Sequence, residues 1–496
     1  MDTSTLTFPF DNTFAQLPER FYARLAPTPV SSPRLVRLND ALARQLCLDP
    51  LDLTGTNGVE VFAGNCVPDR ADPLAMTYAG FQFGSWVPQL GDGRAILLGE
   101  LIDCDGQRRD VQLKGAGRTP FSRMGDGRAG LGPVLREYIV SEAMAALDIP
   151  TTRSLAAVLT GERVIRENSL PGAVLTRVAS SHIRVGTFQY FAARRDTEAL
   201  ALLADHVLHR HHPNLTSVDE PYLALLNAVI ERQAALVAQW QLIGFIHGVM
   251  NTDNMSIAGE TIDYGPCAFM DTYHPETVYS SIDHMGRYAY QNQPPIAHWN
   301  LAGLAQALLP LLSENEDEAV EKATAAINTF PECFKASYTA GLGRKLGLST
   351  VDASDEVLGS DLLERMARNK ADFTLTFRYL SALSQTQNDA DNHVRALFEE
   401  PAEFDQWATD WRVRLAQEGV TDSERQDQMC KANPIYIPRN HLVEAAIRAA
   451  EDSDDPAPFN DLVTVLASPY LQQPGAEAYA EPPRPEQVVQ QTFCGT

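Results

Sequence analysis

The sequence predicts an α+β fold of two lobes, in which a small β-rich lobe precedes a larger, mostly helical lobe that ends in a helical extension. Two observations support this prediction. Short apolar stretches bounded by Gly and Pro, typical of strands, gather between residues 84 and 114. Long apolar patterns with helical spacing dominate from about residue 221 onward. At 496 residues the chain is long enough for more than one core.

We expect four segments along the chain. Residues 1–75 form a lead-in that packs on the small lobe, and residues 76–175 form that lobe. Residues 176–450 form the helical lobe with its extension. Residues 451–496 form a C-terminal region whose tail is rich in Pro and poor in large apolar residues, so we expect it to be flexible.

The lead-in contains a helical pattern, Leu35-Val-Arg-Leu-Asn-Asp-Ala-Leu-Ala-Arg-Gln-Leu. In the small lobe, Trp86-Val-Pro-Gln-Leu, the turn Gly91-Asp-Gly-Arg and the apolar run from Ala95 to Asp103 read as a hairpin with a Gly-rich tip. A further strand, residues 109–114, ends in a lysine.

The predicted helices follow. One spans about residues 132–147, with apolar residues at helical spacing. A longer one, about 221–246, is apolar on most sides, as suits a buried helix. From about residue 298 the remainder reads as helices, including an acidic one near residues 314–328.

Composition excludes several classes of function. The net charge of −24 disfavours binding to nucleic acid or anionic membrane, because those surfaces repel an acidic protein. The seven cysteines form no Cys-x-x-Cys pair, so we expect free thiols in a reducing cytosol rather than a zinc site or a disulfide framework. The first residues lack a basic and apolar signal, and no window approaches the length of a membrane span. We therefore expect a cytoplasmic, soluble monomer.

One stretch points to chemistry. His247-Gly-Val-Met-Asn-Thr-Asp-Asn-Met-Ser, followed by Asp263-Tyr-Gly, resembles the catalytic loop and metal motif of protein kinases. Asn254 and Asp263 match the two residues that hold Mg²⁺ there. The catalytic Asp of a kinase, however, stands five residues before the Asn, and this position is Val249. Because valine cannot accept a proton, ordinary phosphoryl transfer is disfavoured.

Two more features extend the kinase pattern. Lys114 ends a predicted strand, and a helix carrying Glu137 follows 23 residues later, close to the spacing at which a kinase Lys meets its helix Glu. Periodicity alone leaves Glu137 and Glu142 open as the partner. Asp253 is the only carboxylate within the loop, so it is the candidate general base, although an Asp that merely caps the turn would look the same.

Candidate phosphate contacts come from turns and arginines. Two Gly-Asp-Gly-Arg turns, at Gly91 and at Gly125, could bring backbone N–H groups close to an anion, although a simple turn explains each as well. Arg94 adds a cation beside the first turn. Arg177 and Arg184, seven residues apart, could neutralise a triphosphate that lies deep in a cleft.

With these residues in place, the chain resembles the SelO/YdiU family of protein adenylyltransferases. Long motifs carry the resemblance: Tyr78-Ala-Gly-Phe-Gln-Phe-Gly-Ser-Trp-Val-Pro-Gln-Leu-Gly-Asp-Gly-Arg, Leu113-Lys-Gly-Ala-Gly-Arg-Thr-Pro-Phe-Ser-Arg, the loop from His247, Asp263-Tyr-Gly-Pro and Asn433-Pro-Ile-Tyr-Ile-Pro-Arg-Asn-His-Leu. The resemblance implies a pseudokinase fold that binds ATP in an inverted orientation. It also implies transfer of AMP to Ser, Thr or Tyr hydroxyls of proteins, with release of diphosphate.

The resemblance also implies roles for residues. Lys114 contacts phosphate and Glu137 orients it; Asn254 and Asp263 hold Mg²⁺, or Mn²⁺ in its place; Asp253 is the proton acceptor. The nucleotide site is implied to comprise Gly91, Gly93, Arg94, Lys114, Asp126, Gly127, Arg177, Arg184 and Asp263. An ionised Asp near Mg²⁺ has a low pKa, so we expect Asp253 to act mainly by orienting the hydroxyl.

Two other functions compete with AMP transfer. One is a kinase with an atypical base, and the other is a catalytically silent scaffold that binds ATP. The resemblance adds a redox hypothesis, because Cys494 occupies the place where some members of the family carry selenocysteine. Cys267 is a conceivable disulfide partner for it, and two unrelated thiols are the alternative.

Overall fold

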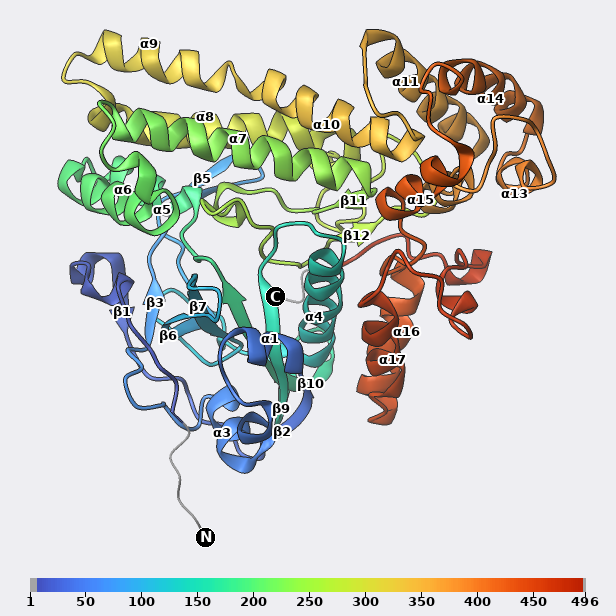
Figure 1. Cartoon of the computed structure of the whole chain (residues 1–496). Coiled ribbons are helices and arrows are strands. Elements are labelled where there is room, and N and C mark those ends of the chain that lie inside the picture. Colours follow the sequence, from blue (N-terminus) through green and yellow to red (C-terminus); the bar gives the residue numbers. More distant parts are fainter. Residues whose placement is uncertain (1–6, 494–496) are drawn as a thin grey trace.

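The computed structural model describes residues 7–493 and contains one large sheet covered by many helices (Figure 1). Eight antiparallel strands form the sheet in the order β1-β3-β6-β7-β10-β9-β2, and β8 pairs with β10. Their bounds are β1 Tyr22–Arg24, β2 Arg34–Leu38, β3 Leu74–Met76, β6 Ala95–Ile102, β7 Arg108–Lys114, β8 Ala129–Gly130, β9 Arg153–Ile165 and β10 Ser169–Ala179. Two small pairs stand apart: β4 Gly80–Gln82 with β5 Ser85–Val87, and β11 Phe245–Ile246 with β12 Ala268–Phe269.

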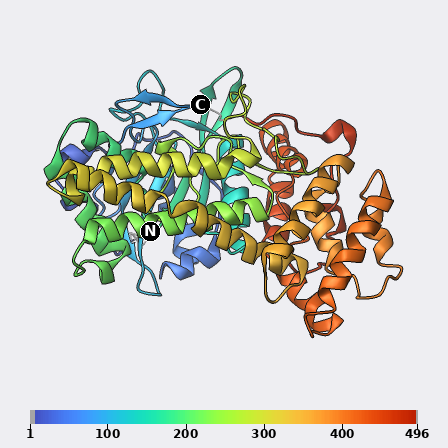
Figure 2. The ribbon, with the colours of Figure 1, turned by 90° about the horizontal axis from the view of Figure 1, so that it is seen from above.

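Helices cover the sheet and build the rest of the chain. In chain order they are α1 Asp40–Gln45, α2 Pro50–Thr54, α3 Thr56–Ala63, α4 Leu131–Ala146, α5 Val185–Ala193, α6 Thr197–His211, α7 Pro221–Leu242, α8 Gln293–Leu312, α9 Glu316–Ile327, α10 Phe330–Leu346, α11 Ala353–Asn369, α12 Phe373–Leu380, α13 Asp391–Arg395, α14 Pro401–Leu415, α15 Asp422–Ala432, α16 Asn440–Ser453 and α17 Ala457–Leu466. Figure 2 shows α11 to α15 gathered at one end of the molecule, beside the layer of α7 to α10. Within residues 7–493, none of these helices is both apolar and long enough to cross a bilayer.

The structure combines a sheet region with many helices. This confirms the predicted α+β class as far as the secondary-structure content is concerned. Helix α4 lies against the sheet, where Leu135 and Ile139 are buried with Leu175 of β10. Its other side meets α16 and α17, because Val443 of α16 and Phe459 of α17 belong to the same buried cluster. Helix α4 is therefore a shared wall between the sheet and the C-terminal helices. The boundaries at residues 75, 175 and 450 stay predictions.

The helical pattern predicted at Leu35 is wrong in its first half. Residues Arg34–Leu38 form strand β2, which pairs with β9, and only Asp40–Gln45 are helical. Asn39 separates the two elements because its side chain accepts a hydrogen bond from the backbone N–H of Leu42 and so caps the helix. Pairing with a neighbouring strand overrides a local helical pattern.

Two more predictions need correction. The turn at Gly91 is not the tip of a hairpin between β5 and β6, because β5 pairs with β4. Pro88 follows β5 directly and has no N–H to extend a ladder. The long helix ends at Leu242 rather than at residue 246, since Gly244 adopts a positive φ of 71° and Phe245–Ile246 pair with β12.

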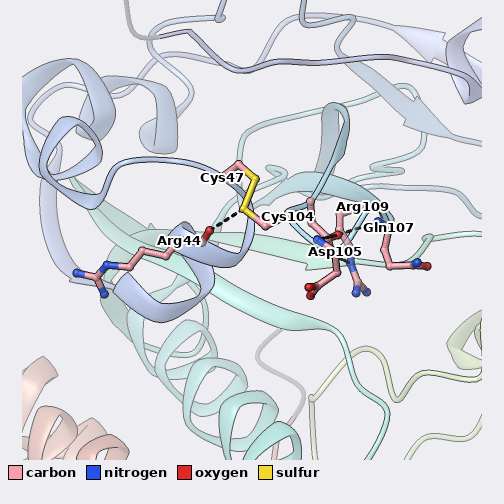
Figure 3. The surroundings of a disulfide bond; sticks show 7 residues. Arg44, Cys47, Cys104, Asp105, Gln107 and Arg109 are labelled. Carbon is pink, nitrogen blue, oxygen red and sulfur yellow. Dashed lines mark hydrogen bonds and ion pairs between the residues drawn. A yellow bond between two sulfur atoms is a disulfide. The ribbon is translucent and has the colours of Figure 1, made fainter.

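The expectation of free thiols is wrong for two cysteines. Cys47 and Cys104, 57 residues apart, form a disulfide that ties the end of α1 to the turn between β6 and β7 (Figure 3). Sequence spacing could not reveal this pair, because the fold alone brings them together. Cys267 is free and buried, and burial raises the pKa of its thiol to about 12. Cys494 lies outside the described residues, so its pairing with Cys267 stays a prediction.

Candidate functional site

A cavity of about 900 Å³ gathers the residues that the sequence singled out. It lies where the ends of β7 and β10 meet the loops at residues 91–94, 121–128 and 249–254. The predicted residues that line it are Gly91, Gly93, Arg94, Lys114, Asp126, Gly127, Arg177, Arg184, Asp253, Asn254 and Asp263. Glu137 does not line the cavity but contacts two of these residues from behind.

Lys114 pairs with Glu137, which resolves the choice left open by the sequence. Lys114 Nζ lies 2.6 Å from Glu137 Oε2, and the other carboxylate oxygen accepts a hydrogen bond from Arg177. Glu142 instead binds Arg153 and the backbone of Ser154. Burial, together with the neighbouring Arg177, lowers the pKa of Lys114. Burial opposes ionisation of Glu137, yet Arg177 and Lys114 hold its pKa below the usual value.

Asp263 is the centre of a cluster of cations. Arg177 Nη2 lies 2.5 Å from its Oδ1, Lys114 Nζ lies 3.4 Å from the same oxygen, and Arg184 donates to Oδ2. Burial alone would raise the pKa of Asp263, but these cations bring it well below its usual value. Its backbone has a positive φ of 62°, which is uncommon for a non-glycine residue and is characteristic of functional sites.

Asp253 has a different environment from Asp263. Gln82 Nε2 donates to its Oδ2 at 3.2 Å, whereas Oδ1 is buried and has no hydrogen-bond partner among the described residues. Arg184 binds the backbone carbonyl of Asp253 rather than its carboxylate. Burial raises the pKa of Asp253 to about 6. The carboxylate that faces the cavity is therefore more basic than an ordinary Asp. The low pKa expected for this Asp beside bound Mg²⁺ stays a prediction.

The loop before Asp263 is fixed by buried contacts. His247 is fully buried, and its Nε2 lies 2.8 Å from the carbonyl oxygen of Ile262, next to Asp263. Val249 contributes its backbone, because its carbonyl accepts a hydrogen bond from Asn254 Nδ2 at 2.9 Å. This contact orients the Asn254 side chain at the cavity wall. Val249, which stands where a kinase has its base, thus positions Asn254 through its backbone. Its apolar side chain did not suggest this role.

The glycines of the two turns are required by close packing. A side chain at Gly93 would meet the Phe121 carbonyl at 2.9 Å, and one at Gly127 would meet the Gly117 carbonyl at 2.1 Å. Asp126 pairs with Arg166 at 2.9 Å, so it holds the second turn against the end of β9. The two turns therefore approach each other through the segment around Phe121.

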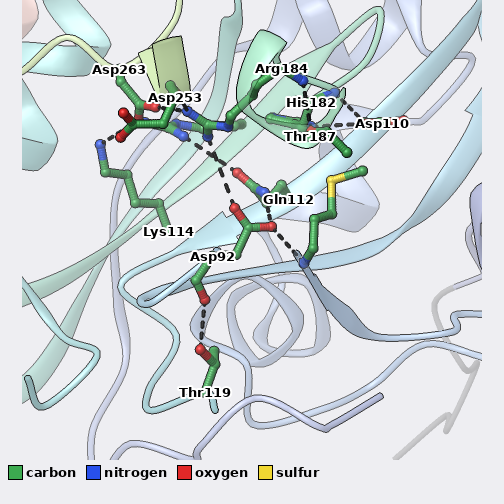
Figure 4. Close-up of polar contacts among 12 residues, drawn as sticks. Asp92, Asp110, Gln112, Lys114, Thr119, His182, Arg184, Thr187, Asp253 and Asp263 are labelled. Atoms are coloured by element: carbon green, nitrogen blue, oxygen red, sulfur yellow. Dashed lines mark hydrogen bonds and ion pairs between the residues drawn. The ribbon is translucent and has the colours of Figure 1, made fainter. Parts of the chain in front are cut away.

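Two buried polar residues, Asp92 and Gln112, lie behind the arginines and were not predicted from the sequence (Figure 4). Gln112 Oε1 accepts from Arg177 at 3.4 Å, and its Nε2 donates to Asp92 at 3.3 Å. The other Asp92 oxygen lies 4.0 Å from Arg184. The chain Arg177, Gln112, Asp92, Arg184 thus links the two cations from behind. A polar residue within the otherwise apolar run Val111–Leu113 was the available signal.

The residues also suit a divalent cation that arrives with a nucleotide. No cluster of three or more His, Cys, Asp or Glu side chains arranged for a metal occurs in residues 7–493. Mg²⁺, however, is commonly held by one or two protein oxygens together with substrate phosphates and water. Asn254 and Asp263 both line the cavity, and an amide and a carboxylate oxygen are ligands of that kind. The donor set therefore fits Mg²⁺ bound with ATP, but not a site made by protein alone.

Comparison with known proteins identifies the family. The model of the family "Protein adenylyltransferase SelO" matches residues 4–467. "Protein nucleotidyltransferase YdiU" of Rhodopseudomonas palustris strain BisB5 is 64% identical over 492 residues, which cover 99% of this chain and 100% of the relative. The protein of the same name from Bradyrhizobium diazoefficiens is 63% identical with the same coverage. As the sequence motifs predicted, the chain belongs to the SelO family of protein adenylyltransferases and is a nucleotidyltransferase.

Proposed function

We propose that this protein transfers AMP from ATP to Ser, Thr or Tyr hydroxyls of other proteins and releases diphosphate. The observation that carries the proposal is the cluster of Lys114, Arg177 and Arg184 around Asp263, beside a buried Asp253. We also propose the two-lobed, kinase-like arrangement, with the cavity between the sheet and the helical layer.

The three cations bind the phosphates in this proposal. Arg177 and Arg184 are always charged and offer planar forks, which suit phosphate oxygens. If they hold the β- and γ-phosphates, they neutralise the charge that develops on departing diphosphate. Cations placed on the leaving group favour breakage at the α-phosphate. Backbone N–H groups of Gly91, Gly93 and Gly127, with Arg94 and Asp126, complete the nucleotide site.

The transfer step balances with residues of the cavity. The acceptor hydroxyl oxygen forms a bond to the α-phosphorus, and the bond from that phosphorus to the oxygen bridging the β-phosphate breaks. Diphosphate leaves with the bonding electrons, and the hydroxyl proton passes to Asp253. Its Oδ1 is buried and has no hydrogen-bond partner among the described residues, so this oxygen is available to the proton. Asn254 and Asp263 would hold Mg²⁺ or Mn²⁺, which supplies neutralisation of the phosphate charge.

Two alternative functions are compatible with the same cavity. A kinase would need a base near the γ-phosphate, which the buried Val249 cannot supply. A silent scaffold would keep the cations without turnover. The three functions predict different products. AMP transfer attaches the α-phosphate to protein, a kinase attaches the γ-phosphate, and a scaffold attaches neither.

The deciding experiment incubates the purified protein with Mg²⁺, a mixture of acceptor proteins, and ATP labelled on either the α- or the γ-phosphate. We expect protein labelling from the α-label only, and its loss in Asp263→Ala. The matched control is Asp219→Ala, which changes an exposed Asp outside the cavity. We expect this variant to keep the labelling. Labelling from the γ-phosphate would establish a kinase, and labelling from neither would favour a scaffold or the absence of the specific acceptor from the mixture.

A further inference from the structure

A second cavity, of about 650 Å³, lies beside the candidate active site. Its walls come from the β4–β5 hairpin, from α5, from α8 and from the start of α9, and we call it the α5–α8 groove. Phe81 and Trp86 of the hairpin line this groove, whereas Gln82 and Phe83 line the nucleotide cavity. Since neighbouring strand residues point to opposite faces, the hairpin separates the two spaces.

One wall of the groove is aromatic and open to solvent. The Phe81 ring lies 4.9 Å from the Trp86 ring and 5.2 Å from the Trp299 ring. Trp86 is 37% exposed, and Trp299, which contacts Phe81 from outside the groove lining, is 41% exposed. Exposed aromatic side chains gathered in a concave place are typical of sites that bind protein partners.

A buried amide in the groove has an unused hydrogen-bonding group. Gln189 of α5 is only 6% exposed, and its Oε1 has no hydrogen-bond partner among the described residues. Leaving such an acceptor unpaired is costly, so the groove favours a ligand with an N–H donor. The Gln306 carbonyl is a second acceptor. Pro310 has no N–H and so cannot donate the helical hydrogen bond that this carbonyl would accept. An extended peptide carries backbone N–H groups that suit both acceptors.

The end of the groove at α9 is acidic. Glu314 and Glu316 line it and are exposed, and no ion pair involving either of them is found among residues 7–493. Both carboxylates are available to a Lys or Arg of a bound segment. Arg195, which follows α5, also lines the groove, so only the end at α9 is acidic. The acidic end favours a basic residue in the bound peptide, and the aromatic wall favours a large apolar side chain beside it.

The hairpin that separates the two cavities also contacts the loop of the candidate base. The backbone N–H of Phe81 donates to Thr252 Oγ1 at 2.8 Å, and Gln82 Nε2 donates to Asp253 Oδ2 at 3.2 Å. Helix α5, which carries Gln189, begins immediately after Arg184 of the cation cluster. A segment in the groove thus lies against elements that also position Asp253 and Arg184.

We propose that the α5–α8 groove binds an extended segment of the acceptor protein, with an apolar side chain against Phe81 and Trp86 and a basic residue at Glu314 and Glu316. Binding there places a hydroxyl farther along the segment at Asp253. The inference rests on the proposed AMP transfer to proteins and names the chemistry of its acceptors.

The test uses the full-length protein and a library of short synthetic peptides that each carry one Ser, Thr or Tyr. Ala193→Trp blocks the groove at an exposed position, and Glu314→Lys with Glu316→Lys reverses its charge. The matched controls are Ala302→Trp, an exposed alanine of α8 outside the groove, and Asp317→Lys with Glu321→Lys, which change the net charge equally.

For peptides with an apolar and a basic residue, we expect the groove variants to raise KM about tenfold, because centrally placed contacts dominate binding. The kcat and the KM for ATP stay at the wild-type values. Controls keep the wild-type KM for peptides. Unchanged peptide KM in both groove variants would overturn the groove proposal while AMP transfer stands. Absence of AMP transfer in the wild-type protein would overturn the proposed function itself. Equal loss in variants and controls would show that the substitutions act through overall charge or stability, and would also reject the groove.

Discussion

Lys114 and Glu137 form a buried ion pair, with 2.6 Å between Nζ and Oε2, although 23 residues separate them. The pair holds the Lys114 ammonium at the wall of the cavity, because Glu137 cannot turn away without also losing its ion pair with Arg177.

Glu137→Gln is expected to lower kcat/KM for AMP transfer about 100-fold, since both cations lose their fixed partner. The measurement is transfer of α-labelled AMP to protein at several ATP concentrations. Glu142→Gln, on the same helix but paired with Arg153, is the control and keeps activity. Equal losses in the two variants would indicate that only the stability of α4 matters.

Asp253→Asn is expected to lower kcat about 100-fold or more, because the amide keeps the shape of the side chain but cannot accept a proton. Nucleotide binding, measured by calorimetry with a non-hydrolysable ATP analogue, should stay close to wild type. A variant that transfers AMP at the wild-type rate would remove Asp253 from the mechanism.

Gln112→Leu is expected to raise KM for ATP about tenfold with a smaller change in kcat, because it disconnects Asp92 from Arg177 behind the phosphates. Steady-state kinetics with varied ATP measures the effect. Gln107→Leu changes an exposed residue just before β7 and should leave KM unchanged. A purely structural role of Gln112 would instead lower the amount of active protein without moving KM.

Lys345 predicts a pH dependence of stability. It is buried between Phe373 and Phe377, with Nζ 4.2 Å from the Phe377 ring centre, and burial lowers its pKa to about 7. Between pH 7 and the ordinary lysine pKa near 10.5, the unfolded chain binds more protons than the folded one. The free energy of unfolding contributed by this residue therefore rises with pH across that window.

Lys345→Met should remove this dependence. The variant is expected to be more stable than wild type near pH 7, by about 3 to 5 kcal/mol, and the difference should shrink towards pH 10. Denaturant unfolding at the two pH values measures it. Lys335→Met, on the same helix but 65% exposed, should show no such convergence. A constant difference between wild type and Lys345→Met would mean that Lys345 stays charged when folded.

The sequence was most informative where a few neighbouring residues carry the chemistry. The spacing of Asn254 and Asp263, and the distance from Lys114 to a helix Glu, were visible because each motif lies on one loop or one pair of elements. Glu137 and Glu142 could not be told apart, since tertiary packing decides which face of α4 meets the sheet. Asp92 and Gln112 were missed for a related reason, because their contact joins the turn before β6 to strand β7.

Pairing between distant segments was the other source of error. Strand β2 is defined by its partner β9, which lies far along the chain. The disulfide of Cys47 and Cys104 depends on the same kind of long-range placement. Each of these is a property of the assembled sheet and leaves no local pattern in the chain.

In the proposed function, the three cations around Asp263 make nucleotide binding an exchange of partners. Without a ligand, the carboxylate already satisfies Lys114, Arg177 and Arg184, so the cavity does not offer bare positive charge to every passing anion. A phosphate must replace the carboxylate contacts, and a ligand that brings its own divalent cation gives Asp263 a new partner in return. Free phosphate or diphosphate without such a cation would leave the Asp263 carboxylate without a positively charged partner. The same contacts that prepare the site for a metal-bound triphosphate thus discriminate against simpler polyanions that are abundant in a cell.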